Sequence, residues 1–194
     1  MSFCTYNIHD LLDEGGPEKT MDYLASFECP INPEIEHFVA RNAIDFARKN
    51  ISVTYLVINS LHEIAGLFTL THKPSFINPQ LLASNTLKRK LERFCGRVRV
   101  DDKFLSSAFL IAQFSKNLRR LQGVPLSGNE LMKCAFEVLL DIQRKIGGGV
   151  IFVECERQKK LLDFYQNEHN RFVVFGERED HAAGKEYVQL LKVI

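Results

Sequence analysis

A basic, glycine-containing loop is the first segment whose residues could do chemistry. Residues 116–130 read KNLRRLQGVPLSGNE. Ser127 followed three residues later by Glu130 has the spacing of a capping box, which predicts a helix with Ser127 as its N-cap. A helix N-terminus offers backbone N–H groups and partial positive charge, and glycine lets a phosphate approach the backbone closely. The loop therefore predicts an anion site, with candidate residues Lys116, Arg119, Arg120, Gly123 and Gly128.

A tyrosine nearer the C-terminus is the second candidate group. Residues 160–167 read KLLDFYQN, so Leu161, Leu162 and Tyr165 have helical three- and four-residue spacing. A phenol that points the same way as the buried leucines could protonate a leaving group near the centre of a sheet. Glu154 and Glu156 precede this helix at a strand end, and either carboxylate could accept a proton through water.

Structural interpretations of the same residues stay open. The loop around Gly123 could be an ordinary turn beside solvated arginines. A single tyrosine on an amphipathic helix is usually a core residue, and a strand-end carboxylate is usually solvated or structural. Cys155 has no nearby histidine partner that would make it a nucleophile, so we expect a buried strand cysteine.

Hydrophobic patterning predicts the elements that must position these groups. The nearly apolar run 104–114 predicts a long central strand covered on both faces. After Ser127, apolar residues at helical spacing predict a helix that ends at the glycines 147–149. A short buried strand over 150–153 follows, and the helix of Tyr165 comes next.

Flanking elements are expected on both sides of this segment. Asn32 and Pro33 begin an amphipathic helix of about four turns that ends near Asn50. A basic amphipathic helix is expected over 79–95, and short helices on either side of a break at residues 15–17. Strands are expected at 53–58, 64–70, 172–175 and 187–193, with a charged turn over 177–185. This order predicts an α/β or α+β fold with a mixed sheet.

Length, composition and charge bound the class of protein. The 194 residues, 45% hydrophobic and 25% charged, predict a single domain over 1–194 around one core. A net charge of +1 argues against a protein held on nucleic acid by overall charge, although residues 88–99 form a local basic segment.

Cysteines, histidines and targeting signals narrow the class further. The five cysteines are widely spaced without C-x-x-C, and the six histidines lack metal-binding spacing, so no disulfide framework or metal site is predicted. The chain has neither a signal peptide nor a long apolar stretch, which predicts a cytoplasmic protein without membrane anchorage.

Several of these segments together resemble a known family. They are the strand 104–114, the turn ending in Ser127 and Gly128, the strand 151–155, the sequence LLDFY at 161–165 with Phe172 beyond it, and the runs 54–57 and 64–70. In this combination, residues 32–194 resemble the acetyl-CoA-binding core of GNAT-family N-acetyltransferases. The resemblance implies a mostly antiparallel central sheet flanked by helices, with acetyl-CoA as co-substrate.

The resemblance also implies roles for individual residues. Phe114 and Lys116 would offer backbone groups to pantetheine, and Gly123, Ser127, Gly128 and Asn129 would hold the pyrophosphate. Tyr165 matches the general acid that protonates the departing thiolate, with Glu154 as a candidate base. The implied reaction is direct attack of a primary amine, on a small molecule or a protein, on the thioester.

Two departures from the family pattern leave alternatives open. The family's phosphate loop reads Arg or Gln, two residues, Gly, one residue, Gly or Ala, and only Gly128 keeps its register here. Where the family has Gly-Phe after the tyrosine helix, this chain has Asn170 and Arg171 before Phe172, and we expect Asn170 to supply the left-handed turn.

The alternatives are a GNAT-type toxin that acetylates aminoacyl-tRNA and a catalytically inactive GNAT-like binding module. The basic segment 88–99 is the feature that suits RNA, although the near-neutral total charge favours a solvated helix face. RNA is therefore a further candidate partner. A second copy of the chain is another.

Overall fold

A computed structural model describes residues 3–98, 102–181 and 184–194. Its strands follow the order β1-β2-β3-β5-β6-β8-β7, with β4 paired to β5 beside this path. β5 (Lys103–Lys116) is the middle strand of that order, as its apolar run predicts. The chain forms two compact units, one of Met1–Thr71 and Ile111–Glu137, the other of His72–Leu110 and Val138–Ile194. They are called the first and second units below.

In the first unit, β1 (Cys4–Asn7), β2 (Val53–Ile58) and the first half of β3 (Ile64–Ile77) pair antiparallel, and the end of β5 lies next to β3. Thr54 lies opposite Thr69, and their hydroxyl oxygens are 2.9 Å apart. In the neighbouring pair, the rings of Tyr55 and Phe68 stack with centroids 5.2 Å apart. These cross-strand pairs hold the register of β2 against β3.

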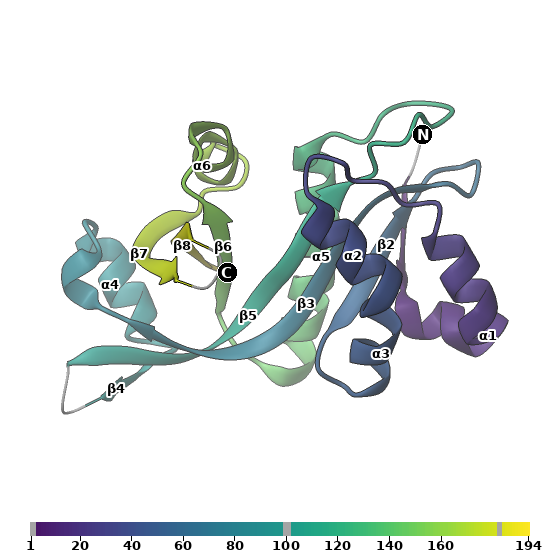
Figure 1. Cartoon of the computed structure of the whole chain (residues 1–194). Helices are drawn as coiled ribbons and strands as arrows, with labels where there is room; N and C mark the ends of the chain where they lie inside the picture. The colour runs from purple at the N-terminus through teal and green to yellow at the C-terminus, as the bar shows by residue number, and fades with distance from the viewer. Residues whose placement is uncertain (1–2, 99–101, 182–183) are drawn as a thin grey trace. The chain divides into compact units, whose positions relative to one another are not determined.

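Helices of the first unit cover one face of this sheet (Figure 1). α1 (Ile8–Leu24) is kinked at Gly16, where φ is 74°, which matches the predicted break. α2 (Pro33–Arg41) begins at the predicted N-cap, with the Asn32 side chain accepting from the Ile35 N–H. The predicted single helix over 32–50 is wrong, because Asn42 separates α2 from α3 (Ala43–Arg48) with a φ of −114°.

α5 (Gly128–Ile146) begins on the opposite face of β3. Leu67 packs in the core cluster with α2 and α3, and successive residues of a strand point to opposite faces. Gly66 therefore faces α5, and a Cβ there would lie 2.9 Å from Leu126 Cδ2 and 3.1 Å from the Ser115 carbonyl oxygen. Only glycine allows this close approach of strand, loop and helix. α5 ends before Gly147, where φ is 77°, as predicted.

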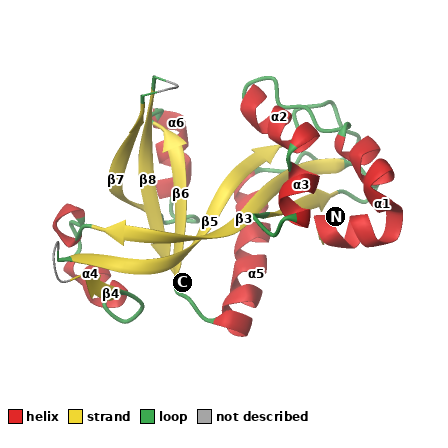
Figure 2. Ribbon diagram, turned by 60° about the horizontal axis from the view of Figure 1, so that its bottom comes forward, coloured by secondary structure: helices red, strands yellow, loops and turns green. Residues whose placement is uncertain are grey.

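The second unit contains an antiparallel ladder of β6 (Val150–Glu156), β8 (Lys185–Val193) and β7 (Val173–Asp180), with β8 in the middle (Figure 2). Val174 pairs with Leu190 and Gly176 with Gln189, so Phe175 is an extra bulged residue. The predicted charged turn over 177–185 is wrong in extent, because residues 177–180 belong to β7. Ion pairs such as Arg157 with Glu177 compensate the charges of this strand.

The expected basic helix over 79–95 consists of two short pieces, a 3-10 turn at Pro79–Leu81 and α4 (Asn85–Leu91), followed by β4 (Gly96–Val98). Leu82 and Leu91 are buried, whereas Arg89 and Lys90 are exposed. Arg99, which belongs to the predicted basic segment, lies outside the described residues. Within the described part of the chain, no helix combines the length and apolar character needed to cross a membrane.

Candidate functional site

The loop between β5 and α5, residues 117–127, carries the predicted anion site in the first unit. The Glu130 N–H donates to Ser127 Oγ at 3.2 Å, and the Ser127 N–H donates to Glu130 Oε2 at 2.8 Å. The predicted capping box is thereby confirmed. The Ser127 hydrogen bonds also hold the pKa of the Glu130 carboxyl below its usual value. Gly128 takes the first helical position, whose N–H has no acceptor within the helix.

We expect Ser127→Ala to lower the free energy of unfolding by about 1 kcal/mol, because it removes the acceptor that caps α5. Urea unfolding followed by circular dichroism measures the difference. Ser127→Asp is the matched control, since its carboxylate can accept the same N–H and should preserve stability. Equal stability of wild type and Ser127→Ala would contradict the capping role.

The other predicted anion-site residues lie on the same loop or at its ends. Lys116, Arg119 and Arg120 are exposed, and Gly123 has a φ of 95°. Arg119 Nε lies 3.8 Å from Glu28 Oε1, an exposed ion pair that contributes little to stability. Phe114 is half-buried near the end of β5, and Asn129 is exposed in the first turn of α5. The predicted anion-site residues therefore lie on one stretch of chain that runs from the end of β5 to the first turn of α5.

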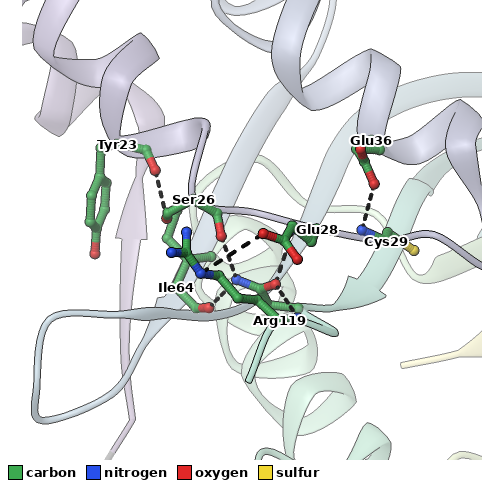
Figure 3. A network of polar contacts seen from close by, with 8 residues as sticks. Tyr23, Ser26, Glu28, Cys29, Glu36, Ile64 and Arg119 are labelled. Atoms are coloured by element: carbon green, nitrogen blue, oxygen red, sulfur yellow. Dashed lines mark hydrogen bonds and ion pairs between the residues drawn. The ribbon is translucent and has the colours of Figure 1, made fainter. Parts of the chain in front are cut away.

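Asn117 is a residue of this loop that the sequence patterns do not single out. Its side chain is buried and bonds to backbone groups of three chain segments, among them those of Ser26 and Ile64, two residues that are labelled in Figure 3. A lone polar residue after a strand has no spacing signature. The sequence marks Asn117 only by its position, between the apolar strand and the arginines at 119 and 120.

Tyr165 lies in the second unit on α6 (Lys159–Gln166), the predicted short helix. Its side chain is buried, and its ring meets Phe164 and Phe172 edge-on, with centroids 5.1 and 5.6 Å away. Burial raises the pKa of the Tyr165 phenol well above its ordinary value, and the nearby Cys155 adds to the shift. The phenol therefore keeps its proton throughout the neutral range.

The turn after α6 holds the end of the tyrosine helix. Asn170 is buried, its Nδ2 donates to the Phe164 carbonyl oxygen at 2.7 Å, and the Phe172 N–H donates to the Tyr165 carbonyl oxygen at 2.9 Å. The expected left-handed turn at Asn170 is wrong, because Arg171 adopts it with a φ of 53°. Asn170 instead uses its carboxamide to bind the last turn of α6.

The predicted proton acceptors are held in polar contacts on β6. Glu154 accepts from Gln189 Nε2 at 2.8 Å and from Arg178 Nε at 3.3 Å to each carboxylate oxygen. Lys185 pairs with Glu156 at 3.0 Å and lowers the pKa of that carboxyl. Burial raises the pKa of the Cys155 thiol to about 11, so this cysteine is an unreactive thiol at neutral pH. The role of Glu154 as a base stays a prediction.

The two candidate clusters belong to different units, the basic loop to the first and Tyr165 to the second. Within the described residues, no three or more histidine, cysteine or acidic side chains group as metal ligands would.

The mixed, mostly antiparallel sheet with flanking helices is a GNAT-like fold, which confirms the predicted fold class. In particular, the chain is similar to AtaT complexed with acetyl-methionyl-tRNAfMet, with 16% identity and a TM-score of 0.64 over 99% of this chain and 95% of that one. A tyrosine-to-phenylalanine mutant of KacT matches with 14% identity and a TM-score of 0.64 over 100% and 95%. AtaTR bound with AcCoA matches with 15% identity and a TM-score of 0.58 over 98% and 92%. No protein-family model and no curated protein sequence matches the chain.

Proposed function

We propose that the chain is an acetyl-CoA-dependent N-acetyltransferase that acetylates a primary amine. The observation that carries this proposal is the junction of β5 and α5, where Lys116 at the end of β5 and two arginines of the loop precede a capped helix N-terminus. The pyrophosphate of coenzyme A requires cations and backbone N–H donors, which this junction supplies. The same fold in AtaTR is known with bound AcCoA.

In the proposed complex, the loop binds the anionic part of acetyl-CoA. Gly123, Ser127, Gly128 and Asn129 hold the pyrophosphate, while Arg119 and Arg120 balance its charge. Phe114 and Lys116 offer backbone groups at the end of β5 to the amides of pantetheine, as the resemblance implies.

Acetyl-CoA supplies an acyl group activated as a thioester. The neutral amine attacks the carbonyl carbon, the new nitrogen–carbon bond forms, and the carbon–sulfur bond breaks with its electron pair on sulfur. Tyr165 donates its proton to that sulfur and then recovers a proton from water, which restores the phenol. The amine gives up its proton to water or, through water, to Glu154, so no covalent enzyme intermediate is needed.

A second candidate function is that of a toxin that acetylates aminoacyl-tRNA. AtaT is described with acetyl-methionyl-tRNAfMet, and the α-amino group of an aminoacyl ester is a primary amine. The exposed basic side chains of α4 suit an RNA partner. Arrest of translation when the chain is expressed, abolished by Tyr165→Phe, would support this candidate, and unimpaired growth would count against it.

Isothermal titration calorimetry with acetyl-CoA tests the proposal directly. The double variant Arg119→Ala and Arg120→Ala should bind at least roughly tenfold more weakly, since hydrogen bonds to charged groups contribute about 1.5 kcal/mol or more. Lys133→Ala is the matched control, because it removes an exposed positive charge from α5 outside the loop. No binding by wild type at millimolar acetyl-CoA would reject both enzyme functions and favour the inactive binding module.

A further inference from the structure

Two polar side chains fasten the segment 118–122 at its two ends. Asn117 lies directly before this segment, and Glu63, in the turn between β2 and β3, bonds to its last residue. Both side chains and the whole segment belong to the first unit. The Asn117 and Glu63 side chains are not among the predicted cofactor-binding residues, but they bond to the backbone of the segment that carries Arg119 and Arg120.

The first anchor is the carboxamide of Asn117. Its Oδ1 accepts from the N–H groups of Glu28 and Arg119, each at 3.0 Å. Its Nδ2 donates to the carbonyl oxygens of Ser26 at 3.1 Å and Ile64 at 2.8 Å. All four hydrogen-bonding positions of the carboxamide are used, which is the full capacity of an asparagine side chain.

Backbone bonds strengthen this anchor. The Asn117 N–H donates to the Ala65 carbonyl oxygen at 2.9 Å, and the Leu118 N–H donates to that of Glu28 at 2.8 Å. The partner segment is itself held, because the Cys29 N–H donates to Glu36 Oε2 of α2 at 2.8 Å (Figure 3). The exit of β5 is therefore tied both to β3 and to the segment between α1 and α2.

The second anchor is the carboxylate of Glu63. Its Oε2 accepts from the Gln122 N–H at 3.0 Å and from Asn59 Nδ2 at 2.8 Å, and Asn59 Nδ2 also lies 3.2 Å from the Gln122 carbonyl oxygen. The Oδ1 atom of Asn59 accepts from the N–H groups of Leu61 and Glu63, so the turn that carries the carboxylate is internally bonded. Gly123, where the chain turns toward α5, follows directly.

We propose that Asn117 and Glu63 are positioning residues for acetyl-CoA, which hold the segment 118–122 in its binding conformation before the ligand arrives. The inference rests on the proposed function. A loop that is ordered before binding loses less conformational entropy when the ligand binds, so its affinity for the ligand is higher. Because the Gln122 N–H donates to Glu63, the backbone donors for a phosphate lie farther along, toward Gly123 and Gly128. The two anchors fix the backbone in the part of the loop where the sequence departs from the family's phosphate-loop pattern.

Calorimetric titration of acetyl-CoA into four variants tests the proposal. Asn117→Ala and Glu63→Ala should each raise the Kd roughly tenfold, which corresponds to about 1.4 kcal/mol. Glu63→Gln keeps an acceptor for the Gln122 N–H and should restore affinity close to wild type. Thr54→Val is the stability control, because it breaks a buried hydroxyl pair of the same unit away from the loop and should lower the melting temperature without changing the Kd.

The outcomes separate this proposal from the proposed function. Wild-type binding together with an unchanged Kd in Glu63→Ala overturns the positioning role and leaves the acetyltransferase proposal intact. Absence of binding by wild type overturns both. If Asn117→Ala does not fold, the half-exposed Glu63 still decides the question, since Glu63→Ala must weaken binding and Glu63→Gln must restore it.

Discussion

Tyr165→Phe is expected to lower turnover by roughly 10²-fold or more, the scale of general acid catalysis, with the Kd of acetyl-CoA close to wild type. The substitution removes only the hydroxyl that would protonate the leaving thiolate. The phenyl ring keeps its edge-on packing against Phe164 and Phe172, so the fold of α6 should persist. Release of the coenzyme A thiol, followed with an amine that the wild type acetylates, measures the effect.

Tyr187→Phe is the matched control for this variant. Tyr187 lies on β8 of the same unit, and the Arg178 Cζ atom lies 4.7 Å from the centroid of its ring. Loss of that hydroxyl should leave turnover unchanged. If Tyr165→Phe also retained wild-type turnover, Tyr165 would have no part in the chemistry.

The pH dependence gives a second measure of Tyr165. Because burial raises its pKa, the folded state keeps the phenol protonated at pH values where the unfolded chain has ionised it, above about 10. This contribution to stability is fully present below that pH and is lost as pH rises through the folded pKa. The wild type should therefore lose stability at alkaline pH more steeply than Tyr165→Phe. If turnover fell near neutral pH in the wild type but not in Tyr165→Phe, the raised pKa of Tyr165 would be contradicted.

Gly66→Ala should have the largest effect on the stability of the first unit, a loss of about 1–3 kcal/mol from overpacking. The added Cβ meets Leu126 and Leu131 side chains as well as the Ser115 carbonyl oxygen, which belongs to the backbone and cannot rotate away. Since these groups flank the loop between β5 and α5, the affinity for acetyl-CoA should fall as well. Denaturant unfolding and calorimetry measure the two effects.

Gly96→Ala is the control for that substitution, because a Cβ at Gly96 meets nothing within 4 Å. It should change stability by a few tenths of a kcal/mol at most, as is usual for open positions. Comparable losses in both variants would show that glycine content, not the close approach at Gly66, determines stability.

Features that depend on neighbours in the chain could be predicted from the sequence. Asn32 caps α2, Ser127 and Glu130 form the capping box, and the glycines at 147–149 end α5, because each signal acts within one helical turn. The apolar run at 104–114 also predicts β5, but the expected cover on both faces is wrong, because Leu105 and Ser107 are exposed between buried neighbours. The short β1 contains no apolar run, and its four residues are either exposed or half-buried, so the sequence does not indicate this strand.

Features that depend on distant partners could not be predicted. Asn117 bonds to Glu28 and Ile64, which are 89 and 53 residues away, so no local spacing reveals its role. Glu154 is held by Arg178 from a strand 24 residues farther on, whereas its position in the sequence left a solvated, a structural and a proton-accepting role equally open to this strand-end carboxylate. The left-handed backbone at Arg171 lies in a turn that the Asn170 carboxamide closes on the Phe164 carbonyl oxygen, a contact that no residue spacing signals.

The charged residues in the second half of β7 affect whether this sheet pairs with strands of other molecules. β7 is the last strand in the sheet order, so one side of it carries no neighbouring strand of the described sheet. Exposed sheet edges invite pairing with another molecule, and charged side chains oppose such edge-to-edge aggregation. Glu177, Arg178 and Glu179 are all exposed at this edge. Residues 177–179, whose charges predict a turn in the sequence, therefore oppose pairing of this sheet edge with a strand of another molecule.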